Sequence, residues 1–150
     1  MEDQKHEYIF TARMNISYHE AMERWYSRWL NFAAFVAVIF SSAAFVAIIS
    51  NVLPIPLQNE TIFAISALFV TFFNAVVLAF NMLPKMTVHN GLKKKWVDFL
   101  SRTSLAETQE EMTKIEKMFH SINSEEPPPN IKRLNKCHAI TIESMGLTTS

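Results

Sequence analysis

The chain has 150 residues, of which 49% are hydrophobic, and its 14 acidic and 14 basic residues give a net charge of zero. This balance hides an uneven distribution, because Glu60 is the only charged residue between Arg28 and Lys85. The length allows one domain. The single cysteine, Cys137, excludes an internal disulfide and a zinc cluster built on thiolates, and it fits a reducing cytosol.

Residues 1–28 form a polar N-terminal segment with scattered aromatic side chains. Ser17 followed by Glu20 matches a capping box, so we expect a helix to start there, with about three turns outside the membrane. For residues 1–16 the sequence leaves two alternatives open, a short interfacial helix and a disordered segment.

Two long apolar stretches follow, Trp29–Leu53 and Thr61–Leu83, separated by the proline-containing segment Pro54–Glu60. Each exceeds 20 residues and is therefore long enough to cross the roughly 30 Å of a bilayer core as a helix. A buried helical pair in a soluble protein is the alternative, but the remaining sequence is too short to cover two helices that are apolar on every face. The sequence predicts an all-α protein in which residues 29–83 form a two-helix transmembrane hairpin.

Cationic residues flank both spans, whereas the loop between the spans contains no Lys or Arg. The positive-inside rule then places both termini in the cytoplasm and makes the chain a multi-pass protein of the inner membrane. Aromatic side chains at the start of the first span are expected to anchor it at the cytoplasmic interface. They are Trp25, Tyr26 and Trp29.

Polar residues recur on the second predicted span at helical spacing. Thr71, Asn74 and Asn81 lie at i, i+3 and i+10, which puts them on one face of a continuous helix. An amide in hydrocarbon needs a partner, so this face either makes interhelical hydrogen bonds or lines a pore. On the first span a ridge of small residues is expected to pack against another helix. It consists of Ala33, Ala37, Ser41 and Ala44.

Residues 84–150 are expected to form cytoplasmic helices that begin after a break at Pro84. One apolar stripe is predicted at Val88, Leu92, Trp96 and Phe99. A capping box at Ser104 and Glu107 is expected to open a second stripe at Leu105, Met112, Ile115, Phe119 and Ile122, as part of either one bent helix or two helices. After Pro127–Pro129 a last helix runs from about Asn130 to Gly146. These helices are too few to enclose a core alone, so we expect them to pack on one another, on the extension of the first helix, or on other copies.

Reactive groups are sparse. The five histidines lie in separate segments without a metal-ligand spacing, and two glycines provide no phosphate-binding loop. We therefore expect no enzyme activity, no metal and no cofactor.

The run Lys93–Lys95 is expected to meet lipid headgroups or to set the topology. Without an aromatic platform or a second basic surface it does not predict nucleic-acid binding.

Several segments together resemble the SLATT family of bacterial two-helix membrane proteins. They are the Arg and aromatic residues at Arg24, Trp25, Tyr26, Arg28 and Trp29, the hairpin itself, His89 and Asn90 leading into Trp96–Leu100, the segment Met112–Ile122, and Glu126–Pro129 with Asn135, Cys137, His138 and Gly146. The resemblance implies a membrane effector of bacterial conflict systems that oligomerises into a pore and ends the life of an infected cell. It implies no catalytic residues.

The sequence thus leads to the expectation of a homo-oligomeric membrane effector, pore-forming or membrane-disrupting, in anti-phage defence. The alternative is a non-conducting, membrane-anchored adaptor that docks a cytoplasmic protein partner through residues 103–145. A phage-encoded hole-forming protein shares the same physics.

Overall fold

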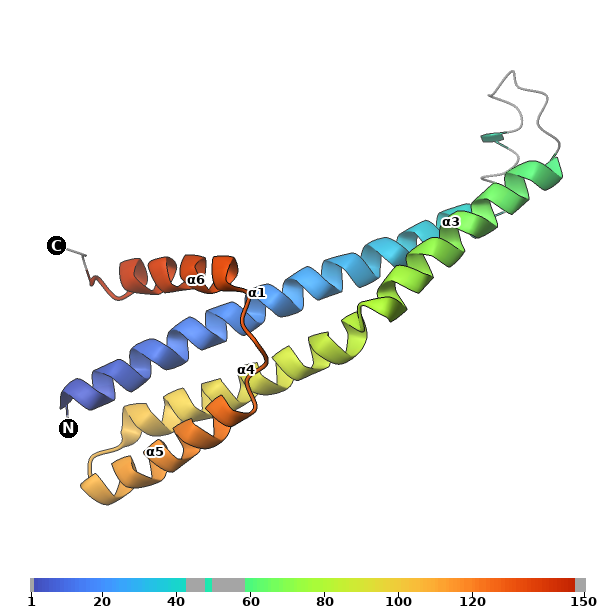
Figure 1. The fold of residues 1–150 in the computed structure, drawn as a ribbon. Coiled ribbons are helices and arrows are strands. Elements are labelled where there is room, and N and C mark those ends of the chain that lie inside the picture. The colour runs from blue at the N-terminus through green and yellow to red at the C-terminus, as the bar shows by residue number, and fades with distance from the viewer. Residues whose placement is uncertain (1, 43–47, 50–58, 148–150) are drawn as a thin grey trace. The chain divides into compact units, whose positions relative to one another are not determined.

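The computed structural model describes residues 2–42, 48–49 and 59–147, and every regular element in these ranges is an α-helix (Figure 1). The helices are α1 (Glu2–Ser41), α3 (Asn59–Ala79), α4 (Met82–Leu105), α5 (Gln109–Ser124) and α6 (Ile131–Ser144). The prediction of an all-helical protein is confirmed. The predicted first span and loop lie partly outside the described residues, at 43–47 and 50–58.

The chain divides into two compact units. Unit 1 comprises Met1–Arg24 with Thr87–Ser150, and unit 2 comprises Trp25–Met86. The predicted division was instead into residues 1–28, 29–83 and 84–150. The N-terminal segment and the C-terminal helices therefore fold together in unit 1.

Helix α1 begins much earlier than the capping-box prediction at Ser17. It starts at Glu2. The negative charges of Glu2 and Asp3 in its first turn interact favourably with the positive end of the helix dipole and stabilise this start. Ser17 lies inside the helix, so the prediction of a helix start there is wrong. Apolar contacts in unit 1 extend the helix through this polar stretch, because tertiary packing outweighs a local capping signal.

The core of unit 1 forms where α1, α4 and α5 meet. Tyr8 of α1 packs edge-on against Phe99 of α4, with ring centroids 5.8 Å apart, and stacks on Phe119 of α5 at 5.0 Å. The buried side chains of this core are Tyr8, Ala12, Leu92, Trp96, Phe99, Ala106, Met112, Ile115 and Ile122. The N-terminal half of α1 therefore covers the predicted apolar stripes of α4 and α5, and the core that results is formed within a single chain.

Helix α6 lies along α1 in unit 1 (Figure 1). The ring of Phe10 meets that of His138 at 5.3 Å, and the Arg133 guanidinium donates to the Ala21 carbonyl at 3.4 Å. These two contacts make the helices antiparallel. The predicted end of α6 is confirmed, because Gly146 has a φ of 67° and its N–H donates to the carbonyl of Glu143.

Three predicted details of the α4–α5 stripes are wrong, and the first is Leu105, which is 76% exposed at the end of α4 and does not join the buried stripe. Val88 is exposed, and the buried stripe that α4 contributes to unit 1 begins at His89 instead. The capping box lies at Thr108 and Glu111, where each side chain accepts a backbone N–H from the other residue, and not at Ser104 and Glu107. Ser104 lies inside α4, and its hydroxyl donates to the Leu100 carbonyl.

In unit 2 the second half of α1 packs antiparallel to α3. Phe32 meets Phe73 edge-on at 5.5 Å, and Phe40 stacks on Phe69 at 5.5 Å. Within the described residues, one helical stretch, Glu60–Ala79, is long and apolar enough to cross a membrane.

The break after α3 occurs at Phe80 and Asn81 rather than at the predicted Pro84. Asn81 adopts a left-handed conformation with φ of 47°, which asparagine tolerates better than most residues, and its carbonyl accepts the N–H of Lys85 in the first turn of α4. Pro84 lies in that same first turn. Because the first four N–H groups of a helix have no intrahelical acceptor, a proline there costs little.

The core assignment makes a testable prediction for stability. Replacing Phe99, which is fully buried, with alanine should destabilise unit 1 by about 3–5 kcal/mol, because it removes a large apolar side chain and leaves a cavity. The matched control is Val97→Ala on the exposed side of the same helix turn, with an expected cost within about 0.5 kcal/mol. Hydrogen exchange of amides 92–122 in the full chain measures both. Equal losses in the two variants would contradict the core assignment.

Candidate functional site

A buried polar cluster, termed here the histidine junction, joins three elements of unit 1. It consists of His19 from α1, His89 and Trp96 from α4, and Glu126 from the connector, residues 125–130, between α5 and α6. His19 and Trp96 are 0% exposed and His89 is 4% exposed. The junction is therefore a set of polar groups inside an otherwise apolar interior, where each group needs a hydrogen-bond partner.

Short hydrogen bonds connect these groups in a chain. The Nδ1 atoms of His19 and His89 are 2.8 Å apart, and the Nε2 atom of His19 is 2.9 Å from Oε1 of Glu126. The same carboxylate oxygen accepts the indole N–H of Trp96 at 2.7 Å. In the described residues, every buried side-chain nitrogen and oxygen atom has a hydrogen-bond partner.

These distances restrict where the protons sit. An ionised Glu126 only accepts, so Nε2 of His19 must carry a proton and donate it. When His19 is neutral, its Nδ1 therefore accepts, and Nδ1 of His89 carries the proton between the two rings. The tautomers of both imidazoles are set by the carboxylate at the end of the chain.

The surroundings of the junction shift two pKa values. Burial, followed by the nearby charge of His19, lowers the pKa of His89 from 6.5 to about 4, although the Glu126 charge opposes this. Burial of Glu126 would raise its pKa, but the hydrogen bonds from His19 and Trp96 and the charges of the two histidines together lower it. At neutral pH the favoured state has an ionised Glu126 and a neutral His89.

Further contacts hold the connector and α6 in place around the junction. The backbone N–H of Asn130 donates to the Tyr18 hydroxyl at 2.8 Å, and Lys95 pairs with Glu125 at 2.6 Å. Asn130 also caps α6, because its side chain accepts the N–H of Arg133. The Tyr18 hydroxyl thus holds the start of α6 against α1, and the side chain of Asn130 caps the helix.

Two of the three lysines predicted to meet lipid headgroups have partners within unit 1. Lys93 pairs with Glu23 of α1, and Lys95 pairs with Glu125 of the connector. Lys94 is exposed and, in the described part of the chain, forms no ion pair. A role in lipid binding stays a prediction for this run, with Lys94 as its least constrained member.

The predicted polar face of the second span is divided by the helix break. Thr71 and Asn74 lie on α3 with exposed side chains, whereas Asn81 lies beyond the end of α3 at Ala79. The helical spacing that placed Asn81 on the face of Thr71 and Asn74 therefore does not reach it. Whether any of the three lines a pore stays a prediction.

The interface anchors lie on α1, and so do the members of the predicted packing ridge that the structure describes. Ala33 is buried, Ala37 is half-buried and Ser41 is exposed, while Ala44 lies outside the described residues. The aromatic anchors touch one another, because the ring of Trp25 lies 4.9 Å from that of Tyr26 and 6.4 Å from that of Trp29. Their position at a membrane surface stays a prediction.

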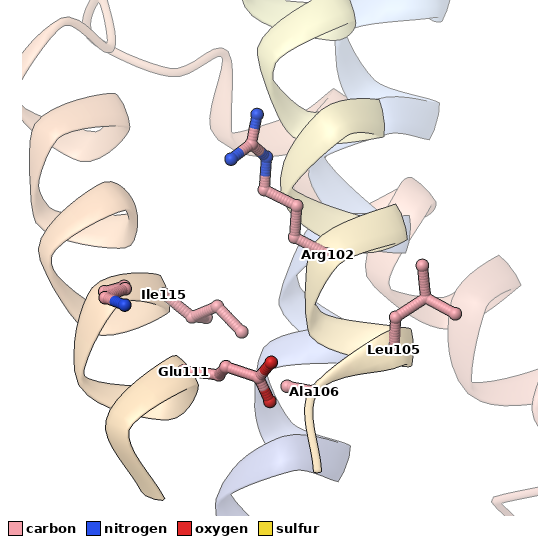
Figure 2. A pocket seen from close by; sticks show the side chains of 6 residues that line it. Arg102, Leu105, Ala106, Glu111 and Ile115 are labelled. Carbon is pink, nitrogen blue, oxygen red and sulfur yellow. The ribbon is translucent and has the colours of Figure 1, made fainter. Parts of the chain in front are cut away.

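A pocket of about 280 Å³ opens at the corner where α4 turns into α5. Figure 2 shows Arg102 and Leu105 on the α4 side, and Glu111 and Ile115 on α5. The Glu111 carboxylate is occupied by the backbone N–H groups of Glu107 and Thr108, at 2.9 and 3.0 Å, which lower its pKa. The other charged residues at the pocket, Arg102 and Lys114, pair with Asp98 and Glu110 on their own helices, so each charged group there already has a local partner.

Sequence reasoning missed the histidine junction. His19 and His89 are 70 residues apart, and Glu126 is 107 residues from His19, so no local spacing connects them. One signal was present, since His89 precedes Leu92, Trp96 and Phe99 on the same helical stripe. No group of three potential metal ligands occurs in the described residues.

No protein-family model, curated protein or solved structure matches the chain. The resemblance to SLATT proteins stays a hypothesis that rests on the residues named for it.

The pKa shifts at the junction predict an acid-sensitive unit 1. In the unfolded chain His89 binds a proton below pH 6.5, whereas in the folded chain its pKa is about 4. Because the unfolded state binds more protons between these two values, folding stability falls as the pH falls from 6.5 to 4. The loss from His89 should reach roughly 3 kcal/mol. Glu126 adds to it below its ordinary pKa of 4.5, since the folded state favours its ionised form. Chemical unfolding of unit 1 measured between pH 7.5 and 4 tests this, and a constant unfolding free energy would refute it.

Proposed function

We propose that this chain is a homo-oligomeric effector of the inner membrane, in which unit 2 crosses the bilayer as a two-helix hairpin with both termini in the cytoplasm. In this proposal the copies assemble through α3 into a pore or a membrane-disrupting structure, and unit 1 is the cytoplasmic part that receives the activating signal. The observation that carries it is a polar pair, Thr71 and Asn74, on the outer surface of an apolar helix.

The surface of α3 supports insertion into lipid. Its 21 residues extend about 30 Å, which matches the thickness of a bilayer core. Large apolar side chains on it remain exposed within a single chain, among them Leu68, Phe72 and Leu78. Exposed apolar surface of this extent is unfavourable in water, and a lipid environment removes the cost.

The polar pair on α3 supports self-association. In the described residues neither Thr71 nor Asn74 has a side-chain hydrogen-bond partner, and both are exposed. An unpartnered amide in hydrocarbon is costly, and a second copy of α3 or a column of water would satisfy it. The resemblance to SLATT proteins favours the same outcome.

A second function, the non-conducting adaptor, is favoured by a different observation. Unit 1 buries its own core without a second copy, so its helices do not require self-association. Under this reading unit 2 is only an anchor, and residues 103–145 dock a cytoplasmic protein. Oligomeric mass and ion flux of the purified chain distinguish the two functions.

The test replaces Asn74 with leucine, which removes the amide and keeps the branched shape and the number of heavy atoms of the side chain. We expect association in nanodiscs to weaken by on the order of tenfold, since an interhelical hydrogen bond in a membrane contributes about 1 kcal/mol, and we expect liposome ion flux to fall with it. Phe72→Leu is the matched control, because Phe72 lies about 160° around α3 from Asn74. It should change neither property.

Position 81 is unsuitable for this test. A leucine there would have to adopt the left-handed backbone of Asn81, so lost flux would report strain as well as lost polarity. A wild-type chain that is monomeric and passes no ions would contradict the effector and favour the adaptor. Unchanged association in Asn74→Leu would contradict the role of the polar pair.

A further inference from the structure

The histidine junction connects α1 and α4, and each of these helices runs from unit 1 into unit 2. Helix α1 is unbroken from Glu2 to Ser41, and α4 begins at Met82, seven residues before His89. A change at the contact between His19 and His89 therefore acts on helices whose other ends belong to the apolar unit.

The junction can accept one additional proton and keep both hydrogen bonds of His19, to His89 and to Glu126. A protonated His19 donates from both ring nitrogens, to Glu126 through Nε2 and to His89 through Nδ1. His89 then accepts at Nδ1 and carries its own proton on Nε2. Both distances in the structure suit this state, and the Glu126 carboxylate neutralises the added charge.

A second proton cannot be accommodated in the same geometry. With both rings protonated, two N–H groups would point at one another across the 2.8 Å between the Nδ1 atoms, and two like charges would lie together in a buried site. At least one imidazolium must then reach water. The side chain of Glu126 is 22% exposed, whereas that of His19 is fully buried, so the connector side is the shortest route to solvent.

We propose that the histidine junction is a proton-operated clasp: it retains its geometry with one added proton, and a second proton detaches the connector and α6 from α1 and α4. The connector is the element that gives way, because α1, α4 and α5 share the aromatic core, whereas α6 buries only Cys137 and Thr141. This proposal concerns unit 1 alone and does not require α3 to conduct.

Other charged groups are packed around the junction. On α1 and α4 they are Glu23 and Lys93, which form an ion pair, and on the connector Glu125 pairs with Lys95 of α4. Arg133 of α6 donates to the carbonyl of Ala21 and remains charged. The Glu125 pair is about half exposed and contributes little, so Glu23→Gln is the variant that measures the effect of the remaining carboxylate.

The experiment is hydrogen exchange of the full chain in nanodiscs between pH 7.5 and 4, corrected for intrinsic exchange rates. We expect amides 131–147 to lose protection at a higher pH than core amides 92–122. His89→Gln keeps a hydrogen-bonding side chain that cannot be protonated, so its α6 transition should move down by about one pH unit. Glu126→Gln removes the charge that stabilises protonated His19, so its transition should move up.

His120→Gln and Glu23→Gln are the controls. His120 is exposed on α5, so its loss should leave the transition unchanged, and Glu23→Gln should move it less than either junction variant. Shifts of His89→Gln and Glu126→Gln in the same direction would overturn the clasp. Simultaneous loss of protection in α6 and in the core would also overturn it, because that is acid unfolding of the whole unit.

A second measurement covers the case in which His89→Gln does not fold. NMR titration of the imidazole signals in the unmodified chain should show at most one of His19 and His89 protonating while amides 131–147 stay protected. Protonation of both rings with α6 still protected would refute the proposal.

Discussion

The packing of the first helix against α4 and α5 is the interaction on which unit 1 depends. Each of these helices presents an apolar stripe that would be exposed if the helix stood alone, and Tyr8 contacts aromatic rings on both partners. Burial of such stripes is the main source of helix stability in proteins. It also explains why a polar stretch such as residues 2–16 is helical at all, since Tyr8, Ala12 and Ile16 fall on the side that meets the core.

The same packing creates the need for the histidine junction. His19 and His89 continue the stripes of α1 and α4, so they are carried into the interior together with the apolar residues. Buried imidazoles require partners, and a carboxylate from outside the three-helix core supplies one through Glu126. The position of α6 along α1 thus follows partly from the hydrogen-bonding needs of two residues on other helices.

The sequence predicted the parts of the fold that depend on local periodicity. Leu92, Trp96 and Phe99, and then Met112 and Ile115, recur at helical spacing, and all five are buried. Features that depend on distant segments were not predictable in this way. The start of α1 is set by α4 and α5. The capping box that forms, at Thr108 and Glu111, has the same spacing as the predicted ones at Ser17 and Ser104, and both of these serines lie inside helices.

The candidate site was the least predictable part, because its hydrogen-bonded residues come from three segments and are 30, 70 and 107 residues apart. The polar face predicted for the second span required an unbroken helix through Asn81. The helix instead ends at Ala79, and Asn81 has a left-handed backbone conformation. A single asparagine inside an apolar run is a weak signal for a turn, whereas a proline is a strong one. The break was therefore predicted at Pro84, although Pro84 lies in the first turn of α4, where a proline is tolerated.

Three consecutive prolines in the connector, Pro127–Pro129, have a consequence for reversibility. Each ring fixes φ, so this stretch has few conformations to lose when it returns to the surface of α1 and α4. The entropic penalty of re-docking is thereby reduced, and in the proposed clasp a detached α6 remains tethered to the three-helix core by this short, stiff segment. Such a tether favours rapid recapture once the disturbance has passed, so that each molecule could respond many times without refolding.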